Sequence, residues 1–351
     1  MTGPGQPDRR NREPVEAGTS NHAHTGSSRD LVLLPDSNLT PLFGPDLQPG
    51  VQLLALLEHL GVKHDGTLAS IHEATQEVMR NINAVLKGEA SPDIKVPLMV
   101  HATDIEAFAT QPLGDKTREL LDDISLYSRV DAPQGMEADA AIAFGGRAER
   151  VRDRLLHLAH QWNEREVRFD SLVLTGSARE LSDQEHFHER PQDLLAITSG
   201  RGASELPHIE AEMMLWLIKH HPEVPEAWRD GTVNLYSKMA LNRTAPGERP
   251  SAGTLETVRA PFNWVDVQAA GFVSEPAAVQ KWEEIGAHFI TASSQPYTLR
   301  QSLAIAGAFI EQGSPELVIT GIGDIPIEVE EASFVVELAK LIDTEKRLLE
   351  S

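Results

Sequence analysis

Small and charged residues with the potential to bind an anion stand at one turn in the middle of this chain. The turn is Gly145-Gly146-Arg147, which follows the apolar run Ala140–Phe144 and precedes a helical pattern. Paired glycines let a ligand approach the backbone, and the N-terminus of a helix attracts negative charge. Arg147 would add a planar, permanently charged guanidinium. The turn is therefore a candidate anion-binding site.

Three further turns after apolar runs carry residues of similar kinds. They are Thr175-Gly176, Ser293-Ser294 and Thr320-Gly321. In open α/β sheets, ligands bind just outside the carboxyl ends of the strands, where the strand order reverses. Any tight turn after a strand also favours Gly, Ser and Thr, so one such turn alone is weak evidence. Four together favour a shared ligand pocket.

Polar residues near predicted helix starts could complete this pocket. Glu210 could hold a ligand hydroxyl or ammonium group or act as a general base; alternatively, it complements the dipole of its helix. Arg147 and Arg300 each lie early in a helix, where a cation is unfavourable, so either an anionic ligand or a surface carboxylate would explain each of them. Thr254 and Ser294 could donate hydroxyl hydrogen bonds to phosphate or carboxylate, or serve as N-caps.

Composition excludes several classes of protein and site. The chain has 351 residues, a formal net charge of −22 and no cysteine. Such a charge disfavours binding to nucleic-acid phosphates and to anionic lipid. The lack of cysteine rules out disulfides, zinc–thiolate sites and thiol nucleophiles. No apolar run approaches the roughly 20 residues of a membrane helix, and no signal segment opens the chain, so we expect a cytoplasmic location.

A histidine-containing cluster raises the question of a metal. Residues 185–189 read Glu-His-Phe-His-Glu, and two histidines at i and i+2 could bind a divalent ion. The cluster lies in a polar insertion without a third ligand in register, so a solvated loop is the favoured interpretation. We therefore expect no metal site.

The pattern of apolar residues divides the chain into three parts. Residues 1–30 contain almost no large apolar side chain and are predicted to form a disordered tail. Residues 31–135 are predicted to form a helical N-terminal extension. Its helices are expected at 52–60, 67–86 and 115–127, and 98–108 is either a strand or a helix.

Residues 136–351 alternate short apolar runs with helical patterns, which is typical of a parallel sheet. Strands are expected at 140–144, 169–174, 233–236, 288–291 and 317–320. Helices are expected from the Gly145 turn through Gln161, at 209–220, from 254, at 299–312 and at 329–349. The predicted fold class is α/β and Rossmann-like, with a mostly parallel sheet flanked by helices.

Five stretches resemble, in order, the motifs of the YdcF/SanA/ElyC-like proteins of bacteria. They are Gly145-Gly146-Arg147, Leu174–Gly176, Ile209–Met214, Ser251–Thr257 and Thr291–Arg300. The resemblance covers 139–323 and implies a Rossmann-like fold with a polar pocket at the strand ends. The chain differs from the family pattern at several positions. Ser177 replaces the usual Gly, Ile209 the usual Thr or Ser, and Gly253 the usual Asn. Gln295-Pro296-Tyr297 stands where His is common.

Two functions follow from these residues. The first is a small-molecule enzyme or transferase acting on a phosphorylated or nucleotide-like ligand, which could be a nucleotide or an adenosyl-type cofactor. Arg147 and Arg300 would hold the anion, the Gly145-Gly146 and Thr175-Gly176 backbones would cradle it, and Glu210 would do the acid–base work. The alternative is a non-catalytic ligand-binding or regulatory module that uses the same pocket.

Overall fold

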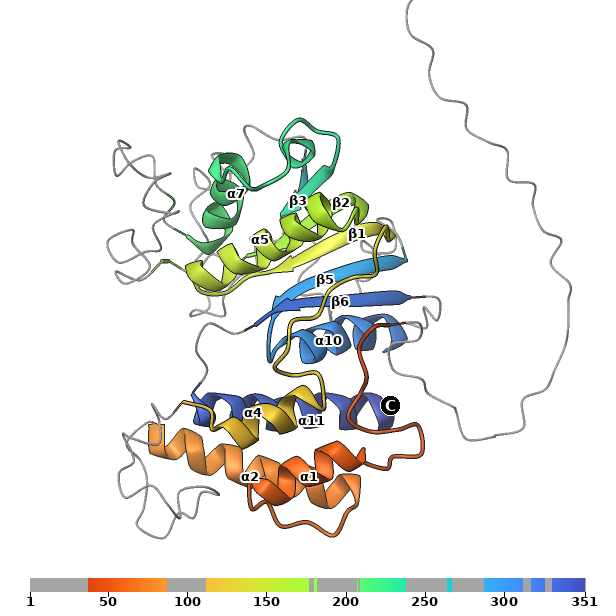
Figure 1. Ribbon diagram of the computed structural model, residues 1–351, viewed down its shortest axis with the longest axis vertical. Coiled ribbons are helices and arrows are strands. Elements are labelled where there is room, and N and C mark those ends of the chain that lie inside the picture. The colour runs from red at the N-terminus through yellow and green to blue at the C-terminus, as the bar shows by residue number, and fades with distance from the viewer. Residues whose placement is uncertain are drawn as a thin grey trace, which may run out of the picture. The chain divides into compact units, whose positions relative to one another are not determined.

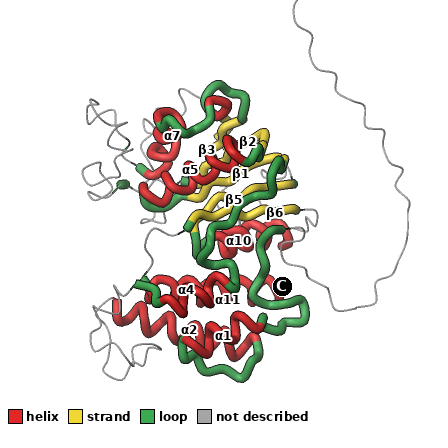
Figure 2. Tube along the Cα trace, in the orientation of Figure 1, coloured by secondary structure: helices red, strands yellow, loops and turns green. Residues whose placement is uncertain are grey.

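A six-stranded parallel sheet positions the candidate site (Figures 1 and 2). Its strands are β1 (Glu137–Phe144), β2 (Arg168–Thr175), β3 (Asn234–Ser237), β4 (Trp264–Asp266), β5 (His288–Ser294) and β6 (Val318–Asp324). Neighbouring strands are parallel, in the order β4-β3-β2-β1-β5-β6. The computed structural model describes residues 37–86, 112–176, 180–181, 207, 209–237, 264–266, 287–311, 317–325 and 330–350. The α/β fold class with a parallel sheet is thereby confirmed.

The central strand β1 consists of small apolar residues because it is covered on both faces. Ala140, Ala141, Ile142 and Ala143 are all fully buried. The strand pairs on one side with β2 and on the other with β5. Strands buried on both faces have continuous apolar runs rather than alternating ones. This explains why the run before the Gly145 turn was recognisable as a strand.

The strand order reverses next to β1. From β1 the chain proceeds outward through β2 and β3 to β4, and then returns to the other side of β1 to form β5 and β6. The carboxyl ends of β1 and β5 therefore meet at a topological switch point, which is where open α/β sheets bind ligands.

Two details of the sheet differ from the sequence-based expectation. The edge strand β4 was missed, because three residues are too few to show a period of two. The run from Leu317 was expected to end at Thr320-Gly321, but β6 continues through both glycines to Asp324. Thr320-Gly321 is therefore part of a strand, and it is not a turn at the sheet edge where ligands bind.

Helices cover both faces of the sheet (Figure 1). On one face lie α5 (Ala148–Glu164) and α7 (Glu210–His220), and the short 3-10 helix η2 (Glu226–Trp228) follows α7. On the other face, α10 (Thr298–Glu311) packs against β5, β6 and α11 (Glu331–Glu350). The first turn of α7 carries Glu210 and Glu212, and its last turn Lys219 and His220, a distribution that complements the helix dipole.

The helical extension consists of α1 (Val51–His59), α2 (Leu68–Leu86) and α4 (Asp115–Asp122). Helix α2 packs along α11, and α1 contacts α4. The pattern predicted that α4 would continue to Tyr127. It ends earlier because Ser125 adopts a left-handed conformation with φ of 56°, which breaks the helical path.

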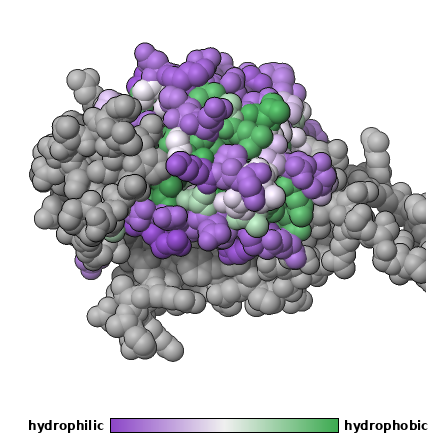
Figure 3. All heavy atoms as spheres, turned by 90° about the horizontal axis from the view of Figure 1, so that it is seen from below, coloured by the Kyte–Doolittle hydropathy of each residue, from purple (hydrophilic) through white to green (hydrophobic). Residues whose placement is uncertain are grey.

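Apolar side chains remain exposed in the extension. Helix α1 buries Leu53, Leu56 and Leu57, whereas its first residue, Val51, is 73% exposed. Figure 3 views the molecule from the side of α1 and α2 and shows apolar patches between hydrophilic side chains. Single exposed apolar side chains such as Val51 are normal for a protein surface.

The free edge of β6 is covered by chain that precedes the sheet. The carboxamide of Asn38 donates to Gly321 O at 2.8 Å and accepts from Gly321 N at 2.9 Å. Val130 exchanges two backbone hydrogen bonds with Gly323, of 2.8 and 3.0 Å. Because an uncovered edge strand invites pairing with another chain, these contacts protect the sheet.

A buried carboxylate holds the segment after Asn38 on α11. Glu345 accepts the Leu42 amide at 2.8 and 2.9 Å and the Phe43 amide at 3.0 Å. The Glu345 side chain is fully buried. Burial raises its pKa to about 8, and the two backbone amides offset this only in part.

We predict that Glu345 makes folding stability fall as the pH rises. Its folded pKa lies above the ordinary value of 4.5, so the native state keeps a proton that the unfolded state loses. The stabilising contribution is complete below pH 4.5 and disappears as the pH approaches 8. At about 1.4 kcal/mol per pKa unit, the loss is on the order of 5 kcal/mol.

The stability of the Glu345→Gln protein should lack this dependence on pH, because an amide does not titrate and still accepts hydrogen bonds. Denaturant unfolding of wild type and variant between pH 4.5 and 8.5 measures the difference in free energy. Glu77→Gln, on the exposed face of α2, is the control. Parallel curves for wild type and Glu345→Gln would contradict the prediction.

Candidate functional site

A buried guanidinium joins the two strand ends at the switch point. Arg154 of α5 donates through Nη1 to Phe144 O at 3.0 Å and also to Gly145 O. Its Nε and Nη2 donate to Ser294 Oγ at 3.4 and 3.2 Å. Arg154 is only 3% exposed. A cation is thus fixed between the end of β1 and the end of β5.

Charged neighbours determine the electrostatics of Arg154. Burial and the nearby positive charge of Arg150 lower the pKa of the Arg154 guanidinium to about 10, whereas the negative charge of Glu210 acts in the opposite direction. The group remains charged at neutral pH. A buried charge is costly unless it is hydrogen-bonded and compensated, and carbonyls, a hydroxyl and Glu210 provide this here.

Glu210 lies against the Gly145 turn. It begins α7 and is 6% exposed. A Cβ atom added to Gly145 would lie 1.9 Å from Glu210 Oε1 and 2.9 Å from Thr175 O. Only glycine fits at this position. The structure therefore brings together Gly145, Thr175 and Glu210, three of the residues that the sequence pointed to.

The second glycine turn serves the packing of α7. Thr175 Oγ1 donates to Ala143 O at 3.3 Å and accepts from Gly145 N at 3.4 Å, which ties the ends of β1 and β2 together. A Cβ atom on Gly176 would lie 2.7 Å from Ala211 Cα and 3.0 Å from Met214 Sδ. The space over Gly176 is thus filled by α7.

The two arginines expected to hold an anion have different surroundings. Arg147 is the exposed N-cap of α5, and none of the described residues pairs with its side chain. Arg300 forms an ion pair through Nε with Glu337 of α11. Its side chain is 27% exposed, and that of Glu337 is 4% exposed. The carboxylate partner considered for Arg300 in the sequence thus exists.

The remaining predicted residues divide between the site and its surroundings. Ser293 is buried and donates to Gln301 Oε1, while Ser294 receives the Arg154 bonds described above. Gly146 faces Arg154, since an added Cβ would lie 3.3 Å from Nη1. Thr254 lies outside the described residues.

Sequence reasoning missed the residues that occupy the switch point itself. Arg154 is one, and Arg150 and Tyr297 are others: the Arg150 guanidinium carbon lies 5.1 Å from the centroid of the Tyr297 ring. The sequence did contain a signal for Arg154. Arg154 falls on the apolar stripe of α5, between the buried Val151 and Leu158. A charged residue on a buried stripe needs a polar reason to be there.

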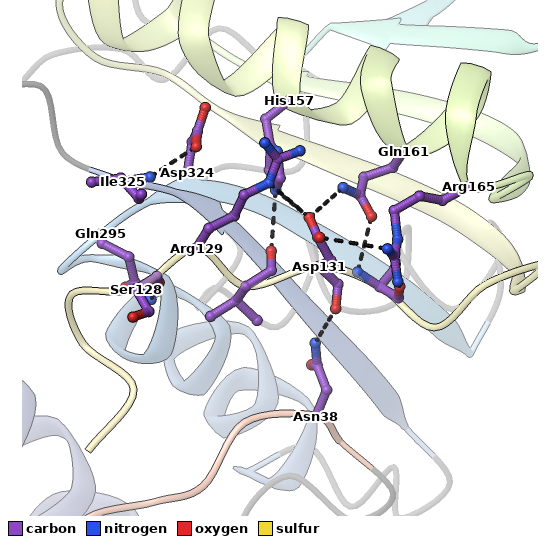
Figure 4. A network of polar contacts seen from close by, with 12 residues as sticks. Asn38, Ser128, Arg129, Asp131, His157, Gln161, Arg165, Gln295, Asp324 and Ile325 are labelled. Atoms are coloured by element: carbon purple, nitrogen blue, oxygen red, sulfur yellow. Dashed lines mark hydrogen bonds and ion pairs between the residues drawn. The ribbon is translucent and has the colours of Figure 1, made fainter. Parts of the chain in front are cut away.

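A second polar cluster attaches the segment before β1 to α5 (Figure 4). Asp131 Oδ1 accepts from Gln161 Nε2 at 2.7 Å and from Arg129 Nε at 3.0 Å. His157 Nε2 bonds to Val130 O at 3.1 Å. Burial would raise the pKa of Asp131, but the hydrogen bonds from Arg129 and Gln161 lower it overall. Burial lowers the pKa of His157 and favours the neutral ring. These contacts hold structure together and leave the switch point as the candidate site.

Comparisons with known proteins were made by sequence and by structure. The chain matches no protein-family model, no curated protein and no solved structure. Within the described ranges, no three His, Asp or Glu side chains are grouped to hold a metal ion, and no helix there has the length and apolarity of a membrane span. The cluster at 185–189 lies outside those ranges.

We predict that Gly176→Ala destabilises the protein by about 1–3 kcal/mol, the usual cost of overpacking. The new methyl group would meet the backbone of α7, which cannot move without displacing Glu210. Gly114→Ala is the control, because its Cβ would meet nothing closer than Thr117 Oγ1 at 3.9 Å. Denaturant unfolding compares the two. Equal stability of both variants would show that α7 accommodates the methyl group.

Proposed function

We propose that the protein binds a small anionic molecule, phosphorylated or nucleotide-like, at the switch point between β1 and β5. The observation that carries this proposal is the gathering of Arg150, Arg154 and Arg300 around these strand ends in a chain of net charge −22. Like charges repel, so such a group is costly unless an anion compensates it.

The contacts of the three arginines indicate that their side chains lie near one another. The Arg150 guanidinium lies over the ring of Tyr297. Tyr297 precedes Arg300 by three residues. The positive charge of Arg150 acts on Arg154 on one side and on Glu337 on the other. Three guanidinium groups are opposed here by the carboxylates of Glu210 and Glu337. Asp153 also acts on Arg154, and Lys340 adds a further cation beside Glu337.

Two helix N-termini add to the positive potential. Helix α5 begins at Ala148, directly after the Gly145-Gly146 turn, and α10 begins at Thr298, shortly after the end of β5. Aligned peptide dipoles give each helix start a partial positive charge, which favours phosphate and carboxylate groups. A cytoplasmic location and a small-molecule partner, rather than nucleic acid, are part of the proposal.

We further propose that Glu210 transfers protons in a reaction of the bound ligand, so that the protein is a small-molecule enzyme or transferase. The carboxylate lies against Gly145, within the influence of the Arg154 charge. Burial next to a cation is a common setting for a general acid or base. Membership in the YdcF/SanA/ElyC-like family belongs to this proposal and rests on the order of the five motifs.

Pyrophosphate serves as the probe for binding. We predict that it raises the melting temperature of wild type, and that Arg150→Ala binds it at least tenfold more weakly in calorimetric titration, because hydrogen bonds to charged groups contribute about 1.5–3 kcal/mol. Arg80→Ala, an exposed position on α2, is the charge-matched control and should bind as wild type does. Equal stabilisation of wild type and Arg150→Ala by pyrophosphate would disprove the anion site.

Catalysis is tested separately from binding. We predict that Glu210→Gln binds pyrophosphate within about threefold of wild type, and that it converts phosphorylated substrates on the order of 100-fold more slowly, the typical loss of a general acid or base. Phosphorus NMR of wild type and variant with pyrophosphate and nucleoside triphosphates measures turnover. Tight binding without any turnover by wild type would instead favour the non-catalytic ligand-binding module.

A further inference from the structure

A carboxylate of α11 lies behind the arginines of the switch point. Glu337 is 3% exposed and pairs with Nε of Arg300, whose side chain is 27% exposed. Arg150, from the opposite face of the sheet, is exposed. A molecule that arrives from solvent therefore meets the two guanidinium groups before it can meet the carboxylate.

The ion pair uses only part of the Arg300 guanidinium. Glu337 contacts Nε, and no other described residue hydrogen-bonds to the side chain. The edge formed by Nη1 and Nη2 is left for another partner. Two parallel N–H groups on this edge match the spacing of two oxygens of a phosphate or carboxylate, which is the geometry of bidentate recognition.

Charged groups from three helices face Glu337. They are Arg300 of α10, Arg150 of α5 and Lys340 of α11 itself. Burial raises the pKa of the Glu337 carboxyl, while these three cations act to lower it. A buried carboxylate is a poor stabiliser of a fold by itself, because its desolvation cost offsets most of the attraction. The contact of Glu337 with Nε also fixes the orientation of the Arg300 guanidinium.

We infer that Glu337 is a positioning residue that holds Arg300 by Nε, so that the Nη1–Nη2 edge of the guanidinium is presented to the bound anion. This inference rests on the proposed function of the switch point. It adds a partner from α11 that the sequence motifs did not include. It also specifies the ligand group as a planar or tetrahedral anion with two oxygens on one side.

A double-mutant cycle with pyrophosphate tests this role. We expect Glu337→Ala to weaken binding about tenfold and Glu337→Gln to recover most of the loss, because the amide oxygen can still accept from Arg300 Nε. We expect Arg300→Ala to weaken binding at least as much. The double variant Glu337→Ala/Arg300→Ala should bind no more weakly than Arg300→Ala alone, since Glu337 acts through Arg300.

A matched control separates positioning from a general change of charge. Asp343→Ala removes one negative charge from the same helix, where Asp343 pairs with His72 and Arg347. It should leave pyrophosphate affinity unchanged. Should Glu337→Ala fail to fold, Glu337→Leu takes its place in the cycle, because it fills the buried volume of Glu337 without an acceptor for Arg300 Nε.

Three results would overturn the inference while the proposed function stands. Tighter binding by Glu337→Ala would mean that the carboxylate competes with the ligand for Arg300. Unchanged binding in both Glu337 variants, or additive losses in the double variant, would mean that the ion pair only ties α10 to α11. If wild type itself does not bind pyrophosphate, the proposed function fails first, and the inference fails with it.

Discussion

The hydrogen bonds of one buried guanidinium determine the arrangement at the switch point. The buried N–H groups of Arg154 require hydrogen-bond acceptors. These are the carbonyls of Phe144 and Gly145 at the end of β1 and the hydroxyl of Ser294 at the end of β5. The Gly145 turn, the start of α7 and the end of β5 all have to fit around the guanidinium. An apolar side chain at position 154 would remove the hydrogen bonds to Ser294 Oγ and the positive charge on which Glu210 acts.

The fold could be predicted from the sequence where each element is long and its apolar pattern is clear. The runs that became β1 and β2 are continuously apolar because both faces are buried, and α5 and α7 show regular helical spacing. The prediction did not include β4, because its pairing with β3 depends on the rest of the sheet and not on three residues. The end of β6 was placed too early, because glycine usually marks a turn.

The candidate site could be predicted only in part, for a physical reason that differs between residues. The sequence pointed to Gly145 and Glu210 because glycine pairs and helix-start carboxylates are local features, and the structure places the two residues side by side. Arg154 was missed because its role depends on which face of α5 is buried, and burial is a property of the tertiary structure. For Arg300, local reasoning supplied two candidate partners, a ligand or a carboxylate, and Glu337 lies far away in the sequence.

The protection of the β6 edge bears on how modular this chain is. Sequence patterns suggest a boundary before β1, between a helical part and an α/β part. Yet Asn38 and Val130, both from the earlier part, saturate the backbone of Gly321 and Gly323. A truncated protein that begins at β1 would expose the unpaired backbone groups of β6. Pairing of this edge with a strand of another molecule would satisfy them. These hydrogen bonds cross the boundary suggested by the sequence, and residues 32–351 form one compact unit.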